Sequence, residues 1–379
     1  MSHQITRKTK TFLVVLCVLV TLLPGANVSF ANTDSRKGKT REPEMFKRSW
    51  DYKVIPNVAI VPVIDSSAVY FVDSENNLLA IDSTSAARIW SSELGGEVAS
   101  NLLLSDTSVL VATNSQSTEG GPAPKTYLRS ISRGTGVTEW RIEIVSTGNV
   151  WIGLYSGSIV AIGEDGSMSG LSRSDGKPIW VRGLGAPITT APLFGQKGII
   201  LGTESKEIFD VAILDGSSRK LWKSEHLPTA LFTDNSGRLV VGDERGRVTA
   251  VGSNGKRSWI FRNGARISSV LLGDTDYLAS SNDNFIYRLT RGGNVKWKRR
   301  LPGRLAQAPL ILDDVAVMSV SGGGGVFVLD VNKGRILDRI ATAEGQSFAI
   351  GGSISDSKNF AIAGPSGVSY FSRGNLVAK

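Results

Sequence analysis

The sequence predicts an all-β fold, an eight-bladed β-propeller with four antiparallel strands per blade, and three observations support this prediction. Tryptophans recur with a period near 40 residues between positions 50 and 297. Each period contains four short runs of strand-forming residues separated by clusters of Asn, Asp, Ser and Gly. The two ends of the chain hold complementary parts of one further period. A repeated four-stranded unit of this length is typical of a propeller blade.

The tryptophan period defines the repeat. Tryptophans at 90, 140, 180, 222, 259 and 297 each close a similar phrase, such as N-N-L-L-A-I-D-S-T-S-A-A-R-I-W at Trp90. A seventh copy, V-F-V-L-D-V-N-K-G-R-I-L-D, has Asp338 where a tryptophan is expected. The intervals between these tryptophans range from 37 to 50 residues, and the longest one precedes Trp140.

Residues 229–263 illustrate the strands within one period. The runs T-A-L-F-T, R-L-V-V-G, R-V-T-A-V and R-S-W-I-F are separated by D-N-S-G, D-E-R-G and S-N-G-K. Such clusters supply the positive φ angles that tight hairpins require. No 11-residue window after the N-terminal apolar stretch shows helical spacing, and this excludes a βαβ fold, which needs crossover helices.

The two ends of the chain are expected to share the eighth blade. The C-terminal part supplies S-F-A-I-G-G-S-I-S, N-F-A-I-A-G and G-V-S-Y-F-S, which read as three strands without a tryptophan strand. The run R-S-W-D-Y-K-V, which contains Trp50, supplies a tryptophan strand without three strands before it. Pairing of these segments would close the ring, and we expect residues 48–379 to form a single, monomeric propeller domain.

The N-terminal residues 1–31 read as an export signal. Arg7, Lys8 and Lys10 precede an apolar stretch over residues 11–23. This stretch is shorter than the about 20 residues that a transmembrane helix needs. Cys17 lies within this stretch, and Leu16 before it departs from the lipoprotein signal pattern. We therefore expect a cleaved signal, a polar flexible linker over residues 32–47, and a periplasmic or secreted chain at the cell envelope.

Composition limits the chemistry of the chain. It carries 2 His, 1 Cys and a formal net charge of +9. Zinc sites are built mainly from Cys and His, so an ordinary structural zinc site is excluded. We expect no catalytic residue, no metal site and no cofactor, and export argues against nucleic acid as a partner.

The repeated phrase resembles the quinoprotein-type propeller repeat over about residues 48–379. The pattern A-x-D-x-x-x-G-x-x-x-W is loosely present in A-I-D-S-T-S-A-A-R-I-W and in V-L-D-V-N-K-G-R-I-L-D. In that family the repeated tryptophan docks between blades, which the resemblance implies here for Trp50, Trp90, Trp140, Trp180, Trp222, Trp259 and Trp297. Within the group, an exported eight-bladed chain of this length is most similar to the propeller subunit of the outer-membrane β-barrel assembly machinery.

The quinone-dependent enzymes of the same group provide an alternative. They bind pyrroloquinoline quinone with calcium, commonly beside a vicinal disulfide, and they carry long insertions that build the pocket. Here the one cysteine falls in the signal, and blades account for almost all residues from 48 onward. The resemblance therefore favours a non-enzymatic scaffold.

Three segments contain residues of types that occur in catalytic, metal-binding or phosphate-binding sites. His226 is the one histidine after the signal, and a turn residue explains it better than a catalytic base. Asp274, Asp276 and Asp283 lack the spacing and terminal Glu of a calcium loop, so we interpret them as hairpin residues. The glycines of residues 321–326 precede no Lys-Ser/Thr pair and no helix, which indicates a turn rather than a phosphate loop.

Two regions are candidates for partner binding. The long interval before Trp140 contains a Gly- and Pro-rich loop over residues 113–127, inserted between the second and third strands of its blade. A basic outer strand, K-W-K-R-R-L-P-G-R, follows Asn294 and Val295, and regular alternation would place Lys296, Lys298 and Arg300 opposite Trp297. The candidate residues are Ser117, Glu119, Lys125, Tyr127, Lys296, Lys298, Arg300 and Arg304.

These features predict an exported scaffold that binds protein partners at the cell envelope, in outer-membrane protein assembly. Two alternatives stay open. One is a ligand-binding or quinone-dependent catalytic propeller that uses its axial funnel. The other is a propeller that binds a glycan or surface polymer, or that touches the membrane, since the basic charge suits an anionic surface.

Overall fold

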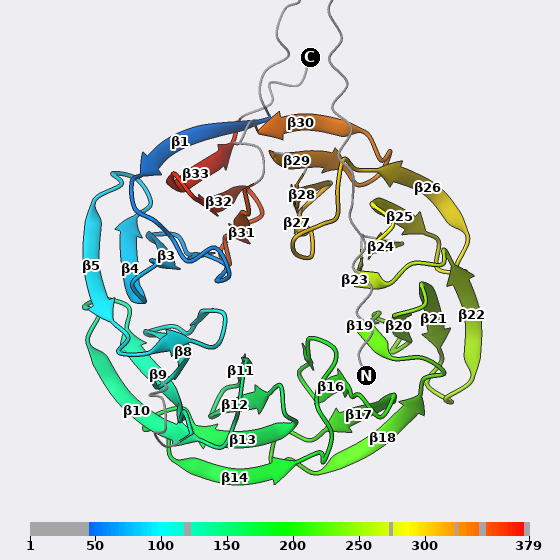
Figure 1. The fold of residues 1–379 in the computed structure, drawn as a ribbon, viewed down its shortest axis with the longest axis horizontal. Coiled ribbons are helices and arrows are strands. Elements are labelled where there is room, and N and C mark those ends of the chain that lie inside the picture. The colour runs from blue at the N-terminus through cyan, green and yellow to red at the C-terminus, as the bar shows by residue number, and fades with distance from the viewer. Residues whose placement is uncertain (1–44, 117–122, 273–275, 323–324, 341–345, 375–379) are drawn as a thin grey trace, which may run out of the picture. The chain divides into compact units, whose positions relative to one another are not determined.

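The structure is a computed structural model that describes residues 45–116, 123–272, 276–322, 325–340 and 346–374. Eight antiparallel sheets lie side by side in a ring, with the first strand of each blade innermost and the last outermost (Figure 1). The predicted all-β, eight-bladed propeller is confirmed. Among the described residues, no helix is long and apolar enough to cross a membrane.

The blades are numbered here in chain order, and the structure gives their strands the following bounds. Blades 1 and 2 comprise β2 (Val63–Ile64), β3 (Ala68–Val72), β4 (Asn77–Asp82) and β5 (Arg88–Glu93), then β6 (Glu97–Val98), β7 (Leu103–Leu104), β8 (Ser108–Asn114), β9 (Thr126–Ser132) and β10 (Thr138–Ile144). Blades 3 and 4 comprise β11 (Val150–Leu154), β12 (Ser158–Gly163), β13 (Ser167–Ser172) and β14 (Pro178–Gly183), then β15 (Leu193–Phe194), β16 (Ile199–Gly202), β17 (Glu207–Val211) and β18 (Ser218–Lys223).

The second half of the ring repeats the pattern. Blades 5 and 6 comprise β19 (Pro228–Thr233), β20 (Leu239–Asp243), β21 (Arg247–Val251) and β22 (Arg257–Arg262), then β23 (Ile267–Leu272), β24 (Tyr277–Ser281), β25 (Phe285–Leu289) and β26 (Val295–Arg300). Blade 7 comprises β27 (Leu310–Leu312), β28 (Val315–Val320), β29 (Gly325–Asp330) and β30 (Ile336–Ile340). Blade 8 comprises β31 (Ala349–Gly352), β32 (Asn359–Gly364), β33 (Gly367–Arg373) and, from the other end of the chain, β1 (Phe46–Tyr52).

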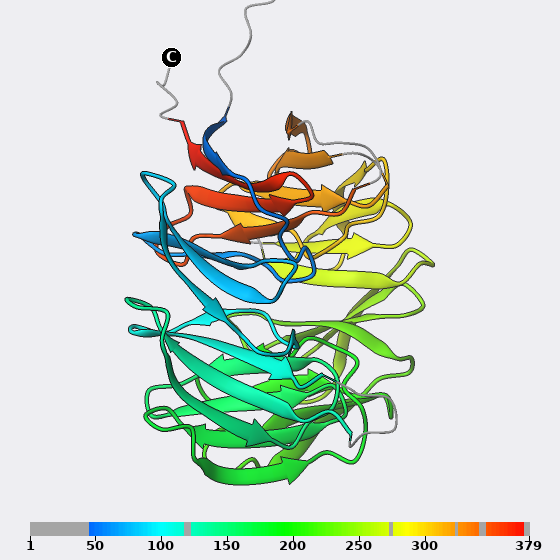
Figure 2. The same cartoon turned by 60° about the vertical axis from the view of Figure 1, so that its left-hand side comes forward.

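Blade 8 closes the ring as predicted. The N-terminal strand β1 pairs antiparallel with β33, with Trp50 opposite Tyr370, and the two strands lie side by side in Figure 2. The rings of Trp50 and Tyr370 are stacked with centroids 5.2 Å apart. Both aromatic residues pack with the core that blade 8 shares with blade 1, so one core joins the two ends of the chain.

The hydrophobic core lies between the blades. One cluster combines Tyr70 and Trp90 of blade 1 with Val109 and Ile131 of blade 2, and similar clusters join the other neighbours. A blade presents an apolar face to each neighbour, and only stacking around the ring covers both faces.

Each outer strand contains the same irregularity beside its tryptophan. In blade 3, for example, Trp180 pairs with Gly170 and Pro178 pairs with Leu171, so that Ile179 is an extra residue opposite no partner. Such a β-bulge redirects the extra side chain. The register shifts at the corresponding place in the outer pairs of the other blades, and in blade 7 the position next to the bulge is Asp338.

The tryptophans beside these bulges dock on the next blade. The indole NH of Trp90, for instance, donates to the carbonyl oxygen of Arg133 in blade 2 at 2.8 Å, and its ring covers Gly136, where a Cβ would lie 2.7 Å from the ring. Trp50, Trp180, Trp259 and Trp297 make the corresponding bonds to the carbonyls of Ser83, Ile213, Arg291 and Val331. Within the described residues, the indole NH groups of Trp140 and Trp222 have no acceptor.

Candidate interaction surfaces

The long loop of blade 2 connects β8 and β9 as predicted, but the predicted bounds 113–127 were too wide, because residues 113–114 belong to β8 and residues 126–127 belong to β9. Ser117 and Glu119 fall outside the described residues. Lys125 is exposed, and its Nζ lies 2.8 Å from Oε2 of Glu143 on the neighbouring strand. The hydrogen bond and charge of Glu143 raise the pKa of Lys125. The guanidinium carbon of Arg141 lies over the Tyr127 ring, 3.7 Å from the ring centre. Both predicted side chains are thus engaged with β10.

The basic strand β26 differs from the regular alternation that we expected. The bulge between Val295 and Trp297 places Lys296 on the same face as Trp297, where its Nζ lies 2.6 Å from Oδ2 of Asp276. That expectation was therefore wrong for Lys296. Lys298 points to the opposite face, with its Nζ 5.4 Å from the centre of the Phe285 ring. Arg300 and Arg304 are exposed.

Lys296 belongs to a polar cluster between blades 6 and 7. Asp276 and Arg288 each expose 6% of their side chains, and Arg288 Nε donates to Oδ2 of Asp276 at 3.0 Å. The Arg288 guanidinium also reaches blade 7, where it binds the carbonyl of Val331 and the side chain of Asn332. Burial raises the pKa of Asp276, but hydrogen bonds from Lys296 and Arg288 outweigh it, and the net pKa is lowered. The predicted interaction residue Lys296 is therefore partly neutralised by a structural contact.

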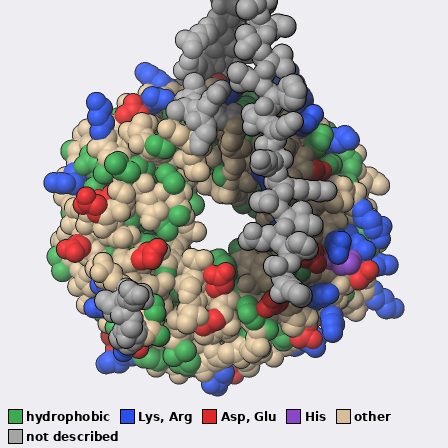
Figure 3. All heavy atoms as spheres, in the orientation of Figure 1, with side chains coloured by type: hydrophobic (Ala, Val, Ile, Leu, Met, Phe, Trp, Pro, Cys, Tyr) green, Lys and Arg blue, Asp and Glu red, His purple; other side chains and the backbone are tan. Residues whose placement is uncertain are grey.

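On the face that Figure 3 shows, the cations do not gather in one patch. Figure 3 shows Lys and Arg side chains around the outer edge of the ring, with several Asp and Glu side chains nearer its central hollow. On this face the positive charge of the rim is therefore diffuse rather than focused.

Asp276 and Asp283 have structural contacts, whereas no such contact is described for the ring of His226 beyond its approach to Glu225. His226 Nε2 lies 3.7 Å from Oε1 of Glu225, and it makes no hydrogen bond to a described residue. Asp283 accepts hydrogen bonds from the Phe285 amide and from Tyr287 Oη. Asp274 and residues 323–324 of the glycine-rich turn lie outside the described residues. Among the described residues, no group of three or more His, Cys, Asp or Glu is arranged to hold a metal ion.

An apolar groove between blades 3 and 4 is the surface that sequence reasoning missed. It has a volume of about 720 Å³ and is lined by Tyr155, Ile179, Trp180, Lys197 and Leu214, among others. Leu214 is 88% exposed and Ile179 is 56% exposed. The hydroxyl of Tyr155 is buried without a hydrogen-bond partner, and burial raises the pKa of this side chain to about 12.

The outer strand beside this groove is unusual in composition. The strand β14 contains one charged residue, Arg182, whereas each of the other outer strands contains two to four. Charged side chains on edge strands discourage pairing with other chains. The low charge of P-I-W-V-R-G could have indicated an interaction surface from the sequence. Nothing in the sequence showed that Leu214 of the next blade would lie beside this strand.

A family model described as outer membrane protein assembly factor BamB matches the sequence over residues 124–259, 209–349 and 244–378. These overlapping matches together span residues 124–378. The chain belongs to the BamB family. This result confirms the predicted quinoprotein-like repeat and its resemblance to the propeller subunit of the assembly machinery. No curated protein matches the sequence at a significant level.

Solved structures share the BamB-family fold at low sequence identity. BamB from Moraxella catarrhalis aligns with a TM-score of 0.65 and 13% identity, covering 88% of this chain and 99% of that one. The C-terminal WD40 domain of Sif2 gives a TM-score of 0.67 and 13% identity, covering 87% and 98% of the respective chains. The computationally designed Ika8 protein gives 0.64 and 14%, covering 85% and 98%. At such identities the structural likeness shows the fold alone.

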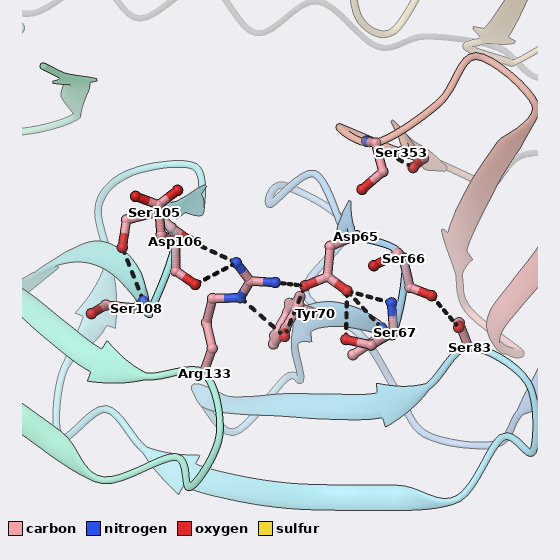
Figure 4. Close-up of polar contacts among 12 residues, drawn as sticks. Asp65, Ser66, Ser67, Tyr70, Ser83, Ser105, Asp106, Ser108, Arg133 and Ser353 are labelled. Carbon is pink, nitrogen blue, oxygen red and sulfur yellow. Dashed lines mark hydrogen bonds and ion pairs between the residues drawn. The ribbon is translucent and has the colours of Figure 1, made fainter. Parts of the chain in front are cut away.

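Blades 1 and 2 of this BamB-family propeller are tied by a buried polar network (Figure 4). Asp65 accepts hydrogen bonds from the amides of Ser67 and Ala68 and from Tyr70 Oη, and it forms an ion pair with Arg133 of blade 2. Burial raises the pKa of Asp65, but these hydrogen bonds and the Arg133 charge lower it further than burial raises it. Arg133 also donates to the carbonyl of Ser105 at 2.7 Å. The network therefore holds the turn between β7 and β8 in place.

Proposed function

We propose that this chain is an exported, non-enzymatic scaffold of the cell envelope that binds a protein partner in outer-membrane protein assembly. Membership of the BamB family supports the assembly role, and the predicted signal over residues 1–31 supports export. The apolar groove between blades 3 and 4 is the observation that carries the proposal. The rim cations Arg300 and Arg304 and the loop of blade 2 are secondary candidates for contact.

The groove suits an extended apolar segment of a partner. Isolated exposed apolar residues are common on protein surfaces, but Ile179 and Leu214 line one cavity together. Burying them against a partner would remove apolar area from water, and residues near the centre of such a contact usually contribute most of the binding energy. Lys197 at the same groove would favour a partner segment with a neighbouring carboxylate.

Site-specific photo-crosslinking in intact envelopes tests this surface. A photoreactive residue at position 179 or 214 should give the same discrete protein adduct. Ile89 provides the matched control, because it is the bulge residue of β5, equivalent to Ile179, and is 48% exposed. Ile179→Asp combined with Leu214→Asp should reduce capture of that partner at least tenfold, whereas Ile89→Asp should leave it unchanged.

Two results would count against the proposal. Adducts at position 89 that match those at 179 and 214 would show non-specific contact. Full partner capture by the double variant, with an unchanged melting temperature, would place the binding surface elsewhere on the propeller.

A further inference from the structure

A second cleft, between blades 2 and 3, has a different character from the apolar groove. Its volume is about 810 Å³, within the range of small-molecule pockets. Hydroxyl-bearing side chains supply much of its lining: Ser105, Thr107, Ser108, Ser130, Ser156 and Ser174. Two carboxylates, Asp106 and Glu139, one guanidinium, Arg173, and the indole of Trp140 also line it. The cleft thus gathers hydrogen-bonding groups of several types.

Glu139 is directed into this cleft by the bulge of β10. Thr138 pairs with Ile131 and Trp140 pairs with Ser130, which leaves Glu139 as the extra residue. Its Oε2 accepts hydrogen bonds from the hydroxyls of Ser108 and Ser130, both at 2.7 Å. Its other oxygen, Oε1, accepts none from a described residue. The carboxylate is therefore held in one orientation with an acceptor available.

Trp140 supplies a donor at the same place. At five other blade junctions the tryptophan NH is bound to a carbonyl of the next blade. The corresponding residue for Trp140 is Arg173, which lines the cleft but is not bonded to the indole in the described structure. The Trp140 nitrogen therefore makes no hydrogen bond to a described residue, and it is not fully buried.

The wall opposite the bulge is also ordered. Arg173 Nη2 of blade 3 lies 3.0 Å from Oδ2 of Asp106 in blade 2. The main-chain carbonyls of Ser105 and Asp106 are held by Arg133, at 2.7 and 3.1 Å. The Glu139 carboxylate and these main-chain carbonyls are thus positioned before any ligand binds, which lowers the entropic cost of binding. The Asp106 side chain is 90% exposed, so its pair with Arg173 is a surface contact.

We propose that this cleft binds a neutral carbohydrate. Each sugar hydroxyl both donates and accepts hydrogen bonds, and the cleft offers a carboxylate acceptor, guanidinium and indole donors, and hydroxyls that can do either. Two carboxylates and one guanidinium give the lining a net charge near −1, which disfavours phosphate and other anions. The polar lining also offers little to an apolar peptide, which fits the groove between blades 3 and 4 better.

Binding can be measured on the full propeller with neutral oligosaccharides of glucose and of N-acetylglucosamine. The probe is the indole NH resonance of Trp140 in a ¹⁵N-tryptophan-labelled sample, assigned with Trp140→Phe. We expect a saturable shift of this resonance with one class of oligosaccharide. Glu139→Ala should weaken that binding at least tenfold. Glu143→Gln, on the same strand but paired with Lys125 outside the cleft, should bind like the wild type.

Several outcomes would overturn the proposal. One is the absence of a saturable shift at about 10 mM of every oligosaccharide, a concentration that fills even a millimolar site. A second is equal affinity in Glu139→Ala with an unchanged melting temperature. A third is a Trp140 shift caused by inorganic phosphate or by a Gly-Ser peptide instead of a sugar. None of these results depends on the protein partner of the apolar groove, so the two proposals can fail separately.

Discussion

Blades 2 and 6 place different chemistry on the same three backbone positions. In blade 2, Ser130 of β9 pairs with Trp140 of β10 on one side and with Leu110 of β8 on the other. Glu139 is the extra residue of the bulge. In blade 6, Arg288 lies opposite both Trp297 and Leu278, and Lys296 fills the bulge. The third position lies two residues before Leu110 in blade 2, where it is Ser108, and two residues before Leu278 in blade 6, where it is Asp276.

The difference decides how far hydrogen bonds seal a blade junction. In blade 6 the long Arg288 side chain reaches the carbonyl of Val331 in blade 7, and Trp297 binds the same carbonyl at 3.2 Å. In blade 2 the short serines bond back to Glu139 and do not cross to blade 3. The junction keeps a cleft, and the Trp140 NH has no described acceptor. The ring of Trp140 still packs on Gly176 of blade 3, as the ring of Trp297 packs on Gly334 of blade 7, so the two junctions differ in the hydrogen bonds that cross them.

The largest expected contrast concerns the two tryptophans. Trp297→Ala removes a docked ring, its hydrogen bonds to blade 7 and its packing on Gly334, and it should lower the free energy of unfolding by about 3 kcal/mol. Trp140→Ala removes a ring that packs on Gly176 of blade 3 but makes no described hydrogen bond to that blade, so the loss should be smaller, about 2 kcal/mol. Urea unfolding of both variants measures the contrast. Equal losses would show that the two junctions are equally tight.

The charged cluster gives the next contrast. Asp276→Asn keeps the shape of the side chain but leaves the buried Arg288 guanidinium without its carboxylate, and about 2 to 3 kcal/mol should be lost. Glu139→Gln in blade 2 changes an exposed residue with serine partners, so its effect should stay below about 1 kcal/mol. Guanidinium unfolding at neutral pH tests the pair, and a Glu139→Gln loss as large as that of Asp276→Asn would contradict the assignment of the seal to blade 6.

The same cluster predicts an acid dependence. The pKa of Asp276 in the folded chain lies below its usual value of 3.8, so the charged carboxylate stabilises the fold above that pH. This contribution should disappear as the pH falls from about 4 through the lower folded pKa. Asp234, whose pKa is lowered to about 2, and Asp65 add to the acid sensitivity of the wild type. The stability difference between wild type and Asp276→Asn should therefore shrink on acidification, and a constant difference down to pH 2 would exclude the mechanism.

The fold could be predicted from the sequence because its signals are local and repeated. The spacing of Trp90, Trp180 and Trp259 gave the blades, and Gly-containing turns gave the strand ends. The orphan strand at Trp50 was sufficient to predict closure onto the C-terminal strands. Each of these inferences needed only the pattern along the chain.

The interaction surfaces could not be predicted in the same way. Simple alternation was wrong for Lys296, because a bulge of one residue moves a side chain to the other face of the strand. The groove brings together Ile179 of blade 3 and Leu214 of blade 4, and the cleft joins Glu139 with Arg173. These pairs come from different blades, so their proximity depends on how the blades pack and on which side chains are too short to fill the junction.

The smallest expected effect concerns the junction that lacks a tryptophan. Asp338 pairs with Val328 at the tryptophan position, and a cleft of about 620 Å³ lined by Ile340, Phe348 and Ile362 lies between blades 7 and 8. Asp338→Trp would bury apolar area against blade 8. Other blades have a turn at the docking position, but blade 8 has two separate chain segments there, at Met45 and Gly374. A carbonyl that could accept the indole NH is therefore less well placed. We expect a gain of up to about 1 kcal/mol in urea unfolding, with Asp338→Ala as the control for loss of the charge alone. A loss of more than about 1 kcal/mol from the tryptophan, with no change from alanine, would mean that this junction is already closed by other side chains and that the empty tryptophan position is not a packing defect.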